Sequence, residues 1–357
     1  MADIPANYKA VVYDKSGEVS TKVVELDMPE PGPGEVLINL THSGVCHSDL
    51  GIMANRWSML PYPTPEGQVG GHEGVGKIVK MGPGTDGSSR KVGDRVGVKW
   101  IAAICGSCPP CLAGYDALCF NNKTSGYHHP GTFQQYVCSP ADYVTPVPES
   151  LPSDMAAPML CAGLTVYSSL RKCGAESGNW VVLLGVGGGL GHLACQIASR
   201  GMGFRVIGID AGSKKDIAME CGAELFIDFE KQNAAEEVKK ATGGLGAQAC
   251  VVLTASNGAY EMSIDLLKFG GTLICAGIPE GEMKAITKAF PQIIIGKALT
   301  IRGVAVGNRR EAIETLEFAE RGIVKTHFRT VKMDGLTKVF EEMDRGEVKG
   351  RVVLDLS

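Results

Sequence analysis

The chain has 357 residues, too many for one ordinary hydrophobic core, so its length favours two domains. Hydrophobic residues make up 44% of the chain, charged residues make up 21%, and the net charge is -4, a balance that creates no electrostatic attraction to nucleic acid or to an anionic membrane. No apolar run approaches the roughly 18 residues of a spanning helix, and the first residues lack a signal-peptide core, so we expect a cytoplasmic protein.

The first ~160 residues contain short β-prone runs that proline and glycine interrupt, a texture typical of an irregular, mostly-β domain. The predicted strands in this part are residues 8–13, 36–40, 75–81, 95–99 and 133–137. We therefore expect residues 1–163 to form one domain.

From about Thr165 onward, apolar strands alternate with amphipathic helices. The predicted strands are residues 180–184, 205–209, 225–227, 249–253, 272–276 and 299–303, and helices are predicted at 190–200 and 214–221. Such βαβ repetition predicts a doubly wound parallel sheet, so the fold class is α/β, with a dinucleotide-binding domain at 164–306. The remainder, 307–357, reads as two helices and a final strand, and we assign it back to the first domain.

Four cysteines at spacings of three, three and eight residues lie in a stretch rich in glycine and proline: Cys105, Cys108, Cys111 and Cys119. Four thiolates at these spacings predict one tetrahedral, structural zinc ion. A nucleic-acid-binding zinc ribbon would bring a second knuckle and basic flanks, and a redox pair would not be followed by two more cysteines at metal spacing.

A second, incomplete ligand set consists of Cys46, His72 and Cys161. Three protein ligands leave one coordination position open, which a catalytic zinc ion requires. Neighbouring residues have plausible supporting roles: Asp49 can orient a ligating histidine, Glu73 follows His72 directly, and the Ser48 hydroxyl can hydrogen-bond to a group held at the metal.

A glycine-rich loop follows the predicted strand 180–184 and opens a helix. It reads as G-x-x-G-x-x-G through Gly185, Gly188 and Gly191, and it also contains Gly189 and Leu190. Glycines let the backbone approach a pyrophosphate, to which the helix N-terminus offers N–H groups. The loop therefore predicts a dinucleotide cofactor.

An acidic residue at the end of the next strand distinguishes NAD from NADP. Asp210 stands nineteen residues after Gly191, where a carboxylate accepts from both ribose hydroxyls and repels a 2′-phosphate. This pattern favours NAD. Lys214 and Lys215 follow closely; Lys215 is a candidate cofactor contact, and the alternative for both is a solvated first helical turn.

Taken in order, segments along nearly the whole chain resemble the zinc-dependent medium-chain alcohol dehydrogenases, most closely those of yeasts and other fungi. They are residues 43–50, 70–74, the four-cysteine stretch, 131–136, 160–167 and 208–210. The resemblance implies a GroES-like fold for the mostly-β domain and a Rossmann fold for the second domain. It also implies two zinc ions per chain, NAD, and a homo-oligomer, with a tetramer favoured.

The resemblance carries roles onto individual residues near the metal. Cys46, His72 and Cys161 match the ligands of the catalytic zinc ion, and Glu73 matches a glutamate that can become a fourth ligand. Ser48 matches the hydroxyl that takes the proton of the alcohol. The implied reaction is reversible hydride transfer between a short primary or secondary alcohol and NAD.

Further residues match positions around the cofactor and the substrate. His47 and Arg351 match contacts to the cofactor pyrophosphate, and Trp57 and Trp100 match bulky walls of a pocket for short alcohols. Gly51 departs from the family, which often carries a histidine there at the end of the proton relay. We therefore expect a shortened relay.

Two alternatives remain open. The first is a polyol or secondary-alcohol dehydrogenase of the same fold, against which two indoles speak because they narrow a pocket and offer few hydroxyl partners. The second is a non-catalytic zinc- and nucleotide-binding relative, against which the intact ligand set weighs. We expect a small-molecule alcohol or aldehyde as substrate, and neither nucleic acid nor a membrane as partner.

Overall fold

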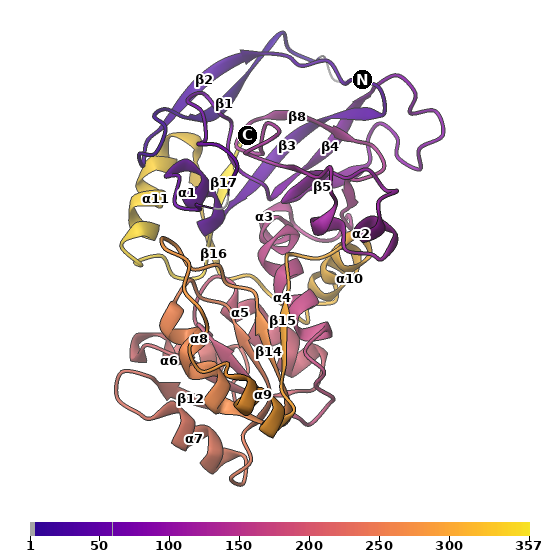
Figure 1. Ribbon diagram of the computed structural model, residues 1–357. Coiled ribbons are helices and arrows are strands. Elements are labelled where there is room, and N and C mark those ends of the chain that lie inside the picture. The colour runs from indigo at the N-terminus through magenta and orange to yellow at the C-terminus, as the bar shows by residue number, and fades with distance from the viewer. Residues whose placement is uncertain (1–3, 59) are drawn as a thin grey trace. The chain divides into compact units, whose positions relative to one another are not determined.

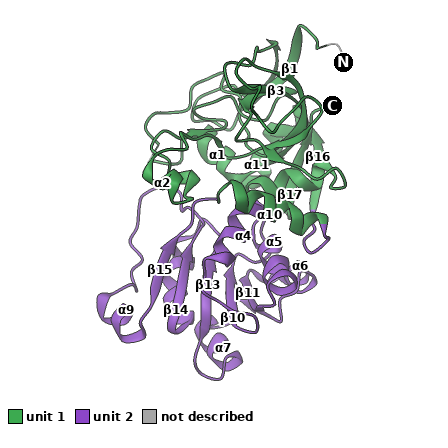
Figure 2. Ribbon diagram, turned by 90° about the vertical axis from the view of Figure 1, so that its right-hand side faces the viewer, with its two compact units in different colours: residues 1–161, 307–320, 328–357 green, residues 162–306, 321–327 purple. Residues whose placement is uncertain are grey.

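The computed structural model describes residues 4–58 and 60–357 (Figure 1), and these divide into two compact units (Figure 2). Unit 1 holds the chain through Cys161 together with Gly307–Glu320 and Phe328–Ser357, and unit 2 holds Ala162–Val306 and Arg321–His327. The sequence assigned 307–357 to the first domain as one piece, whereas Arg321–His327 group with unit 2. Two hydrogen bonds contribute, because the Gln196 amide pairs with both backbone groups of Lys325, at 2.9 and 3.0 Å.

Unit 1 is built around a seven-stranded sheet of order β16-β17-β3-β4-β5-β9, with β8 also paired to β3. In the described part of the chain, the strand pairs of this sheet are antiparallel except for β16–β17. The strands of the unit are β1 Asn7–Tyr13, β2 Thr21–Asp27, β3 Glu35–Val45, β4 Gly74–Met81, β5 Arg95–Val98, β6 Ile101–Ala103, β7 Lys123–Thr124, β8 Tyr136–Pro140, β9 Thr145–Pro146, β16 Phe328–Lys332 and β17 Arg351–Asp355. The predicted strand 133–137 starts later, at Tyr136, because the Phe133 carbonyl instead accepts from Val11 of β1.

The helices of unit 1 are short except for two near its C-terminal end. They are α1 His47–Met53, α2 Pro109–Leu112, α3 Ser153–Ala156, α10 Arg309–Glu320 and α11 Leu336–Asp344. The largest buried side chains of the core include Tyr13, Phe133 and Phe340. The sheet and α11 therefore share one hydrophobic core.

The register of three strands brings distant segments to one place in unit 1. Ser43 of β3 pairs with Gly74 of β4, and Val45 of β3 pairs with Val352 of β17. The residue after β3, those before β4 and the first residue of β17 therefore lie together. These positions carry ionisable and metal-ligating side chains.

Unit 2 is a six-stranded parallel sheet of order β12-β11-β10-β13-β14-β15 (Figure 2). In chain order this is 3-2-1-4-5-6, the arrangement of the Rossmann fold, so the predicted doubly wound sheet is confirmed. The strands are β10 Trp180–Leu184, β11 Arg205–Asp210, β12 Leu225–Asp228, β13 Ala247–Val252, β14 Leu267–Cys275 and β15 Thr300–Gly303. The central strands are almost continuously apolar and buried, as expected for parallel strands covered on both faces.

The helices of unit 2 are α4 Ala162–Arg171, α5 Gly191–Gln196, α6 Lys215–Glu220, α7 Ala234–Ala241, α8 Asn257–Ser263 and α9 Pro291–Lys297. Helix α5 continues as a wider π-helical turn through Gly201. Among the described residues, no helix has the length and apolar character needed to cross a bilayer.

Candidate active site and metal centres

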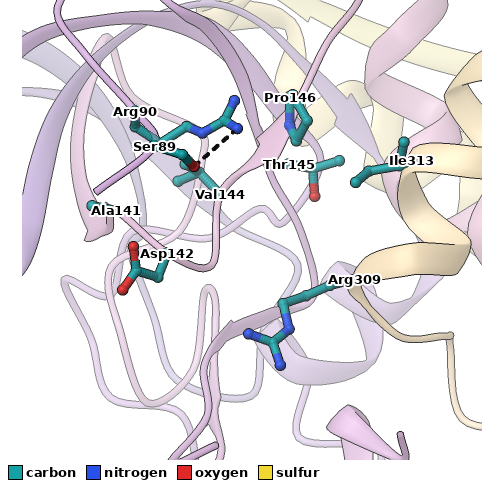
Figure 3. Close-up of a pocket in the computed structure, with 9 residues that line it drawn as sticks. All are labelled: Ser89, Arg90, Ala141, Asp142, Val144, Thr145, Pro146, Arg309 and Ile313. Atoms are coloured by element: carbon teal, nitrogen blue, oxygen red, sulfur yellow. Dashed lines mark hydrogen bonds between the residues drawn. The ribbon is translucent and has the colours of Figure 1, made fainter. Parts of the chain in front are cut away.

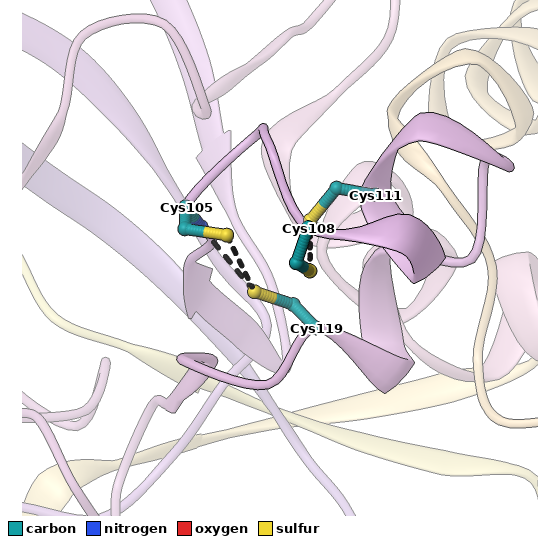
Figure 4. A group of neighbouring side chains, drawn as sticks. All are labelled: Cys105, Cys108, Cys111 and Cys119. Carbon is teal, nitrogen blue, oxygen red and sulfur yellow. Dashed lines mark hydrogen bonds between the residues drawn. The ribbon is translucent and has the colours of Figure 1, made fainter.

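The four cysteines of the predicted structural site converge in unit 1 (Figure 4). All four sulfur atoms lie within 4.8 Å of one another. Two pairs are 3.5 Å apart (Cys108 and Cys111) and 3.6 Å apart (Cys105 and Cys119). A tetrahedral zinc ion with Zn–S bonds of about 2.3 Å separates its sulfurs by about 3.8 Å, whereas a disulfide requires about 2.05 Å. The arrangement therefore fits zinc and contains no disulfide.

Backbone N–H groups prepare this cluster for negative charge. The backbone nitrogens of Cys105 and Asn121 donate to Cys119 Sγ at 3.3 and 3.4 Å. N–H groups of Ser107 and Cys108 lower the pKa of Cys105 to about 5, whereas burial raises the pKa of Cys111 to about 12. Backbone N–H groups thus favour a thiolate at the exposed Cys105, whereas burial disfavours one at Cys111, where a bound cation would offset that effect.

A buried carboxylate connects the cysteine lobe to the rest of unit 1. Asp116 accepts from the backbone nitrogen of Arg309, the first residue of α10, at 3.0 Å, and from the Tyr143 hydroxyl at 3.4 Å. Lys99 lies next to this group, with Nζ donating to the Tyr143 carbonyl at 2.6 Å. Burial lowers the pKa of Lys99 to about 7, and Asp116 opposes the shift. The lobe is therefore anchored at the N-terminus of α10.

The second ligand set also converges. One donor atom from each of Cys46, His72, Glu73 and Cys161 lies within 4.8 Å of the others, and all four residues are buried. Cys46 follows β3 and caps α1, His72 and Glu73 precede β4, and Cys161 precedes α4. Residues far apart in sequence thus form one set of two sulfurs, one nitrogen and one oxygen, a donor set suited to zinc.

The His72 ring is oriented for metal binding. Its Nδ1 lies 2.7 Å from a carboxylate oxygen of Asp49, whose other oxygen accepts from the Cys46 backbone nitrogen at 2.9 Å. Because a carboxylate only accepts, Nδ1 carries a hydrogen, and in the neutral ring Nε2 keeps the free lone pair that a metal ion needs. Among the described residues, this buried Nε2 has no hydrogen-bond partner. A buried nitrogen of this kind is unusual, and a bound metal ion would satisfy it.

The electrostatics of the set favour a cation. A hydrogen bond from Cys161 holds the pKa of Cys46 well below its ordinary value, and the same contact raises the pKa of Cys161. Burial opposes a charge on His72, but the Asp49 carboxylate and the Cys46 thiolate outweigh burial and raise the pKa of His72. The pocket of ligands therefore stabilises positive charge, whether on a ring nitrogen or on a metal ion.

Glu73 and Arg351 form a buried ion pair beside the ligands. Arg351 Nη2 is 2.5 Å from both carboxylate oxygens of Glu73. Burial raises the pKa of Glu73 to about 7, against the opposing charge of Arg351. The structure thus places Arg351, a predicted pyrophosphate contact, in contact with Glu73. The carboxylate is also close enough to the other donors to be a fourth ligand.

The remaining predicted residues of unit 1 lie on or near α1. Ser48 and the exposed His47 form its first turn. Trp57 is buried and packs edge-on against Trp100, with ring centroids 5.9 Å apart, and Trp100 packs edge-on against His72 at 4.8 Å. Two ring contacts in a row therefore connect Trp57, Trp100 and the candidate metal ligand His72.

Sequence reasoning missed two side chains that support the ligands. The Thr132 hydroxyl accepts from the Glu73 backbone nitrogen at 3.1 Å and contacts Ser43 Oγ at 2.7 Å. The Tyr13 hydroxyl donates to the Asp49 carbonyl at 3.3 Å. Thr132 lies in a segment that resembles the family, a signal that could have indicated a role. Tyr13 lies in an ordinary apolar strand pattern, and nothing in the sequence distinguishes it.

In unit 2 the predicted cofactor loop joins β10 to α5. Gly185 has a positive φ of 85°, and the Gly188 backbone nitrogen donates to its carbonyl at 3.1 Å. A Cβ at Gly191 would lie 2.0 Å from the Gly185 carbonyl oxygen, so only glycine fits there. Gly189 and Leu190 complete the loop, which therefore turns tightly into the helix.

Asp210 lies against this loop. Its carboxylate accepts from the Gly187 backbone nitrogen at 2.9 Å and from the Ala211 backbone nitrogen at 2.8 Å. Lys215 is exposed at the start of α6. The structure thus brings Asp210 to the glycine loop at the carboxyl end of β11, the edge at which doubly wound sheets bind ligands.

A separate surface pocket of about 200 Å³ in unit 1 is lined by Ser89, Arg90, Ala141, Asp142, Val144, Thr145, Pro146, Arg309 and Ile313 (Figure 3). Within it, Arg90 Nη2 donates to Ser89 Oγ at 3.2 Å. None of the residues predicted to bind metal, cofactor or substrate lines this pocket.

Comparison with known proteins identifies the family. Residues 32–149 match the alcohol dehydrogenase GroES-like domain, and residues 189–321 match the zinc-binding dehydrogenase domain. The chain is 60% identical to alcohol dehydrogenase 2 of Emericella nidulans, with 99% of each chain covered. It is 39% identical to an alcohol dehydrogenase of Schizosaccharomyces pombe, covering 98% of this chain and 97% of the relative.

Solved structures agree. The alcohol dehydrogenase of Aeropyrum pernix superposes with a TM-score of 0.86 at 28% identity, covering 97% of this chain and 99% of that one. Acetophenone reductase from Geotrichum candidum, in complex with NAD, superposes with a TM-score of 0.84 at 26% identity, covering 99% of this chain and 98% of that one. The predicted resemblance to fungal alcohol dehydrogenases is confirmed. The chain belongs to the zinc-dependent medium-chain alcohol dehydrogenases, enzymes that interconvert alcohols and carbonyl compounds.

Proposed function

We propose that this enzyme transfers hydride reversibly between short primary or secondary alcohols and NAD, with zinc held by Cys46, His72 and Cys161. The observation that carries the proposal is the ligand set itself: buried donors within 4.8 Å of one another, with a His72 Nε2 that has no other partner among the described residues. Three strong ligands leave a position for substrate, and the adjacent Glu73 is a candidate to exchange onto the metal.

When bound, zinc acts as a Lewis acid that makes a hydroxyl group easier to deprotonate. The chain's own residues supply the rest. Asp49 fixes the tautomer and orientation of His72, and the Glu73–Arg351 pair adds two charges that balance each other beside the ligands. Ser48, in the first turn of α1 and two residues after the proposed ligand Cys46, is the residue proposed to accept the proton of the alcohol.

The short, mainly apolar character of the substrate follows from the two tryptophans. Trp57 and Trp100 pack edge to face next to His72, and indoles reduce space while offering only one hydrogen-bond donor each. A polyol would leave hydroxyl groups unpaired against these rings. We therefore favour short monohydric alcohols over the polyol alternative.

NAD is the proposed cofactor because Asp210 lies at the glycine loop, where its charge disfavours a 2′-phosphate. The NAD complex of the Geotrichum candidum relative supports the same choice. His47, exposed on the first turn of α1, remains a proposed pyrophosphate contact.

The deciding experiment combines metal analysis with steady-state kinetics. We expect two zinc ions per chain, and higher kcat/KM for short primary and secondary alcohols than for polyols, with NAD preferred over NADP. One zinc ion per chain without turnover would establish the non-catalytic relative instead. A preference for polyols would overturn the substrate class while leaving the chemistry intact.

A matched pair of variants tests the cofactor assignment. Asp210→Asn should raise the NADP to NAD ratio of kcat/KM, because it removes the repelling charge. Asp228→Asn is the control, since Asp228 ends the adjacent strand in register with Asp210 but lies one strand farther from the loop. An equal change in both variants would contradict the role of Asp210.

We also propose that the enzyme is a homotetramer. Strand β15 lies at the end of its sheet and is exposed along its length, and Ile295 nearby is 79% exposed. A second apolar surface lies on the cysteine lobe, where Leu112 and Phe120 are 76% and 74% exposed. Two distinct self-complementary surfaces are what a tetramer of paired dimers uses.

Light scattering of the purified protein tests this assembly. Wild type should have four times the mass of the chain, whereas Ile301→Lys on β15 and Phe120→Glu on the lobe should each stop assembly at a smaller species. A monomeric wild type would contradict the proposal.

A cytoplasmic location is proposed from cysteine chemistry. All twelve cysteines are free, and six of them are proposed zinc ligands that must stay reduced. A fluorescent fusion expressed in a fungal cell should distribute through the cytosol, and accumulation in an oxidising compartment would contradict this location.

A further inference from the structure

The surface pocket of unit 1 brings together two arginines from separate parts of the chain (Figure 3). Arg90 lies in the loop between β4 and β5, and Arg309 is the first residue of α10. Both guanidinium groups stay charged at any physiological pH. Among the described lining residues, Asp142 is the only acidic one, and its carboxylate accepts from the Ser88 hydroxyl at 3.2 Å. The lining therefore carries a net positive charge.

Both arginines keep N–H donors that the protein does not use. Arg90 donates from Nη2 to Ser89 Oγ at 3.2 Å and pairs with no carboxylate among the described residues. Arg309 directs Nε at a carboxylate oxygen of Asp116, 3.5 Å away, and its two Nη groups make no hydrogen bond in the described part of the chain. A guanidinium with free N–H groups binds oxyanions strongly, because its planar fork can donate to two oxygens at once.

A buried hydroxyl group faces the same pocket. Thr145, on β9, is only 2% exposed, and its hydroxyl has no hydrogen-bond partner among the described residues. The oxygen is not one of the fully enclosed polar atoms that lack a partner, and Figure 3 shows it pointing into the space between the labelled side chains. Buried hydroxyl groups are nearly always hydrogen-bonded. An acceptor inside the pocket would therefore satisfy Thr145.

We propose that this pocket binds a phosphate group, held by Arg90, Arg309 and the Thr145 hydroxyl. A volume of about 200 Å³ holds several water molecules at about 30 Å³ each, so a tetrahedral oxyanion fits. One carboxylate, that of Asp142, opposes two guanidinium groups, so the charge balance favours an anion. Free phosphate and the phosphate ester of a small metabolite share this chemistry. The site lies in unit 1, apart from the glycine loop of unit 2, and does not depend on the function proposed above.

The test titrates the NAD-saturated enzyme with sodium phosphate, while sodium chloride keeps the ionic strength constant. NAD fills the cofactor site, because a glycine loop at a helix N-terminus also attracts phosphate and would otherwise contribute to the signal. Titration calorimetry gives the Kd, and we expect saturable binding of one phosphate per chain. The Tm should rise with phosphate concentration and stay constant with chloride alone, because only the folded chain has the pocket.

Three variants locate the bound phosphate. Arg90→Gln should raise the Kd by about tenfold or more, the usual value of a hydrogen bond to a charged group. Thr145→Val keeps the shape of the side chain and removes the hydroxyl, so it should raise the Kd by about two- to tenfold without lowering the Tm of the phosphate-free protein. Arg310→Gln is the matched control, because Arg310 follows Arg309 on α10 but pairs with Glu314 at 2.8 Å and does not line the pocket. Its Kd should stay at the wild-type value.

The outcomes are distinguishable. Absence of saturable binding would overturn the inference, and so would a Kd that is unchanged in both Arg90→Gln and Thr145→Val, since phosphate would then bind elsewhere. Glycerol 3-phosphate, titrated in parallel, separates the two sources: tighter binding than phosphate assigns the pocket to a phosphate ester, weaker binding assigns it to free phosphate, and either result supports the site. Failure of NAD to bind would contradict the proposed function, while the variants would still decide the phosphate site.

Discussion

The two proposed metal sites of this enzyme are built in opposite ways. The lobe draws its four cysteines from one short stretch, leaves Cys105 exposed, and stabilises thiolates with its own backbone N–H groups. The catalytic site draws its ligands from three distant segments, buries all of them, and orients them with side chains such as Asp49 and Arg351. We therefore expect zinc to stabilise the fold of the lobe, and we expect the fold to hold zinc in place at the proposed catalytic site.

The largest expected difference comes from removing one ligand at each site. Cys161→Ala should abolish activity and keep the fold, because the buried core around it does not depend on zinc. Cys108→Ala should instead lower stability strongly, since a structural zinc ion contributes about 10–16 kcal/mol of binding free energy in small zinc domains. Zinc content, kcat and thermal unfolding of both variants decide the matter. Equal losses of stability would remove the distinction between the sites.

The second largest difference should come from breaking an ion pair near each site. Glu73→Gln leaves the buried Arg351 without its carboxylate, and breaking a buried ion pair costs about 3–5 kcal/mol of unfolding free energy. The double variant Glu73→Gln with Arg351→Met should recover much of that loss.

At the lobe, Arg309→Met removes an ion pair to Asp116 in which the arginine is 49% exposed, and it should cost under about 1 kcal/mol. Denaturant unfolding measures all three variants. A larger loss of unfolding free energy for Arg309→Met than for Glu73→Gln would contradict this prediction.

The Asp49 carboxylate, which orients His72, should affect zinc affinity at only one of the two sites. Asp49→Asn weakens the hold on His72 Nδ1, and loss of such a partner typically lowers metal affinity by about 10- to 100-fold. Competition with a chelator should therefore show one zinc ion per chain that dissociates more readily and one that is unchanged. Weaker binding of both zinc ions would mean that the two sites are coupled.

The smallest expected effect concerns Gly51. Alanine normally stabilises a helix by up to about 1 kcal/mol relative to glycine, but overpacking costs about 1–3 kcal/mol. Because a Cβ would press on the Trp57 indole, Gly51→Ala should be slightly destabilising, and Trp57→Leu should restore the normal benefit of alanine. If Gly51→Ala alone stabilises the protein, the Trp57 indole can move away from the new Cβ without a cost in stability.

The same contact revises the expected effect of Gly51→His. The sequence suggested that an imidazole there would complete a shortened proton relay. The indole fills that volume, so the variant should gain no activity near neutral pH unless Trp57 is also made smaller. A gain in the single variant would show that the relay was limited only by the missing imidazole.

Local patterns in the sequence predicted much of the fold. The strands 180–184 and 205–209 and the loop through Gly191 follow from apolar runs and glycine spacing, because each involves neighbours in the chain. The strand expected at 133–137 was displaced to Tyr136–Pro140, since Phe133 pairs with β1 instead, a long-range choice that no local pattern records. The same reason separates Arg321–His327 from the rest of the C-terminal segment.

The sequence by itself indicated which residues can carry the chemistry: the lobe cysteines, whose spacing alone predicts zinc, and, through family resemblance, the three proposed catalytic ligands and Asp210. Only the tertiary structure decided how they are supported. The His72–Asp49 contact, the Glu73–Arg351 pair and the indole over Gly51 join residues from separate strands and turns. Such contacts depend on strand register and chain reversal, which are properties of the whole fold because they balance packing and hydrogen bonding between distant segments.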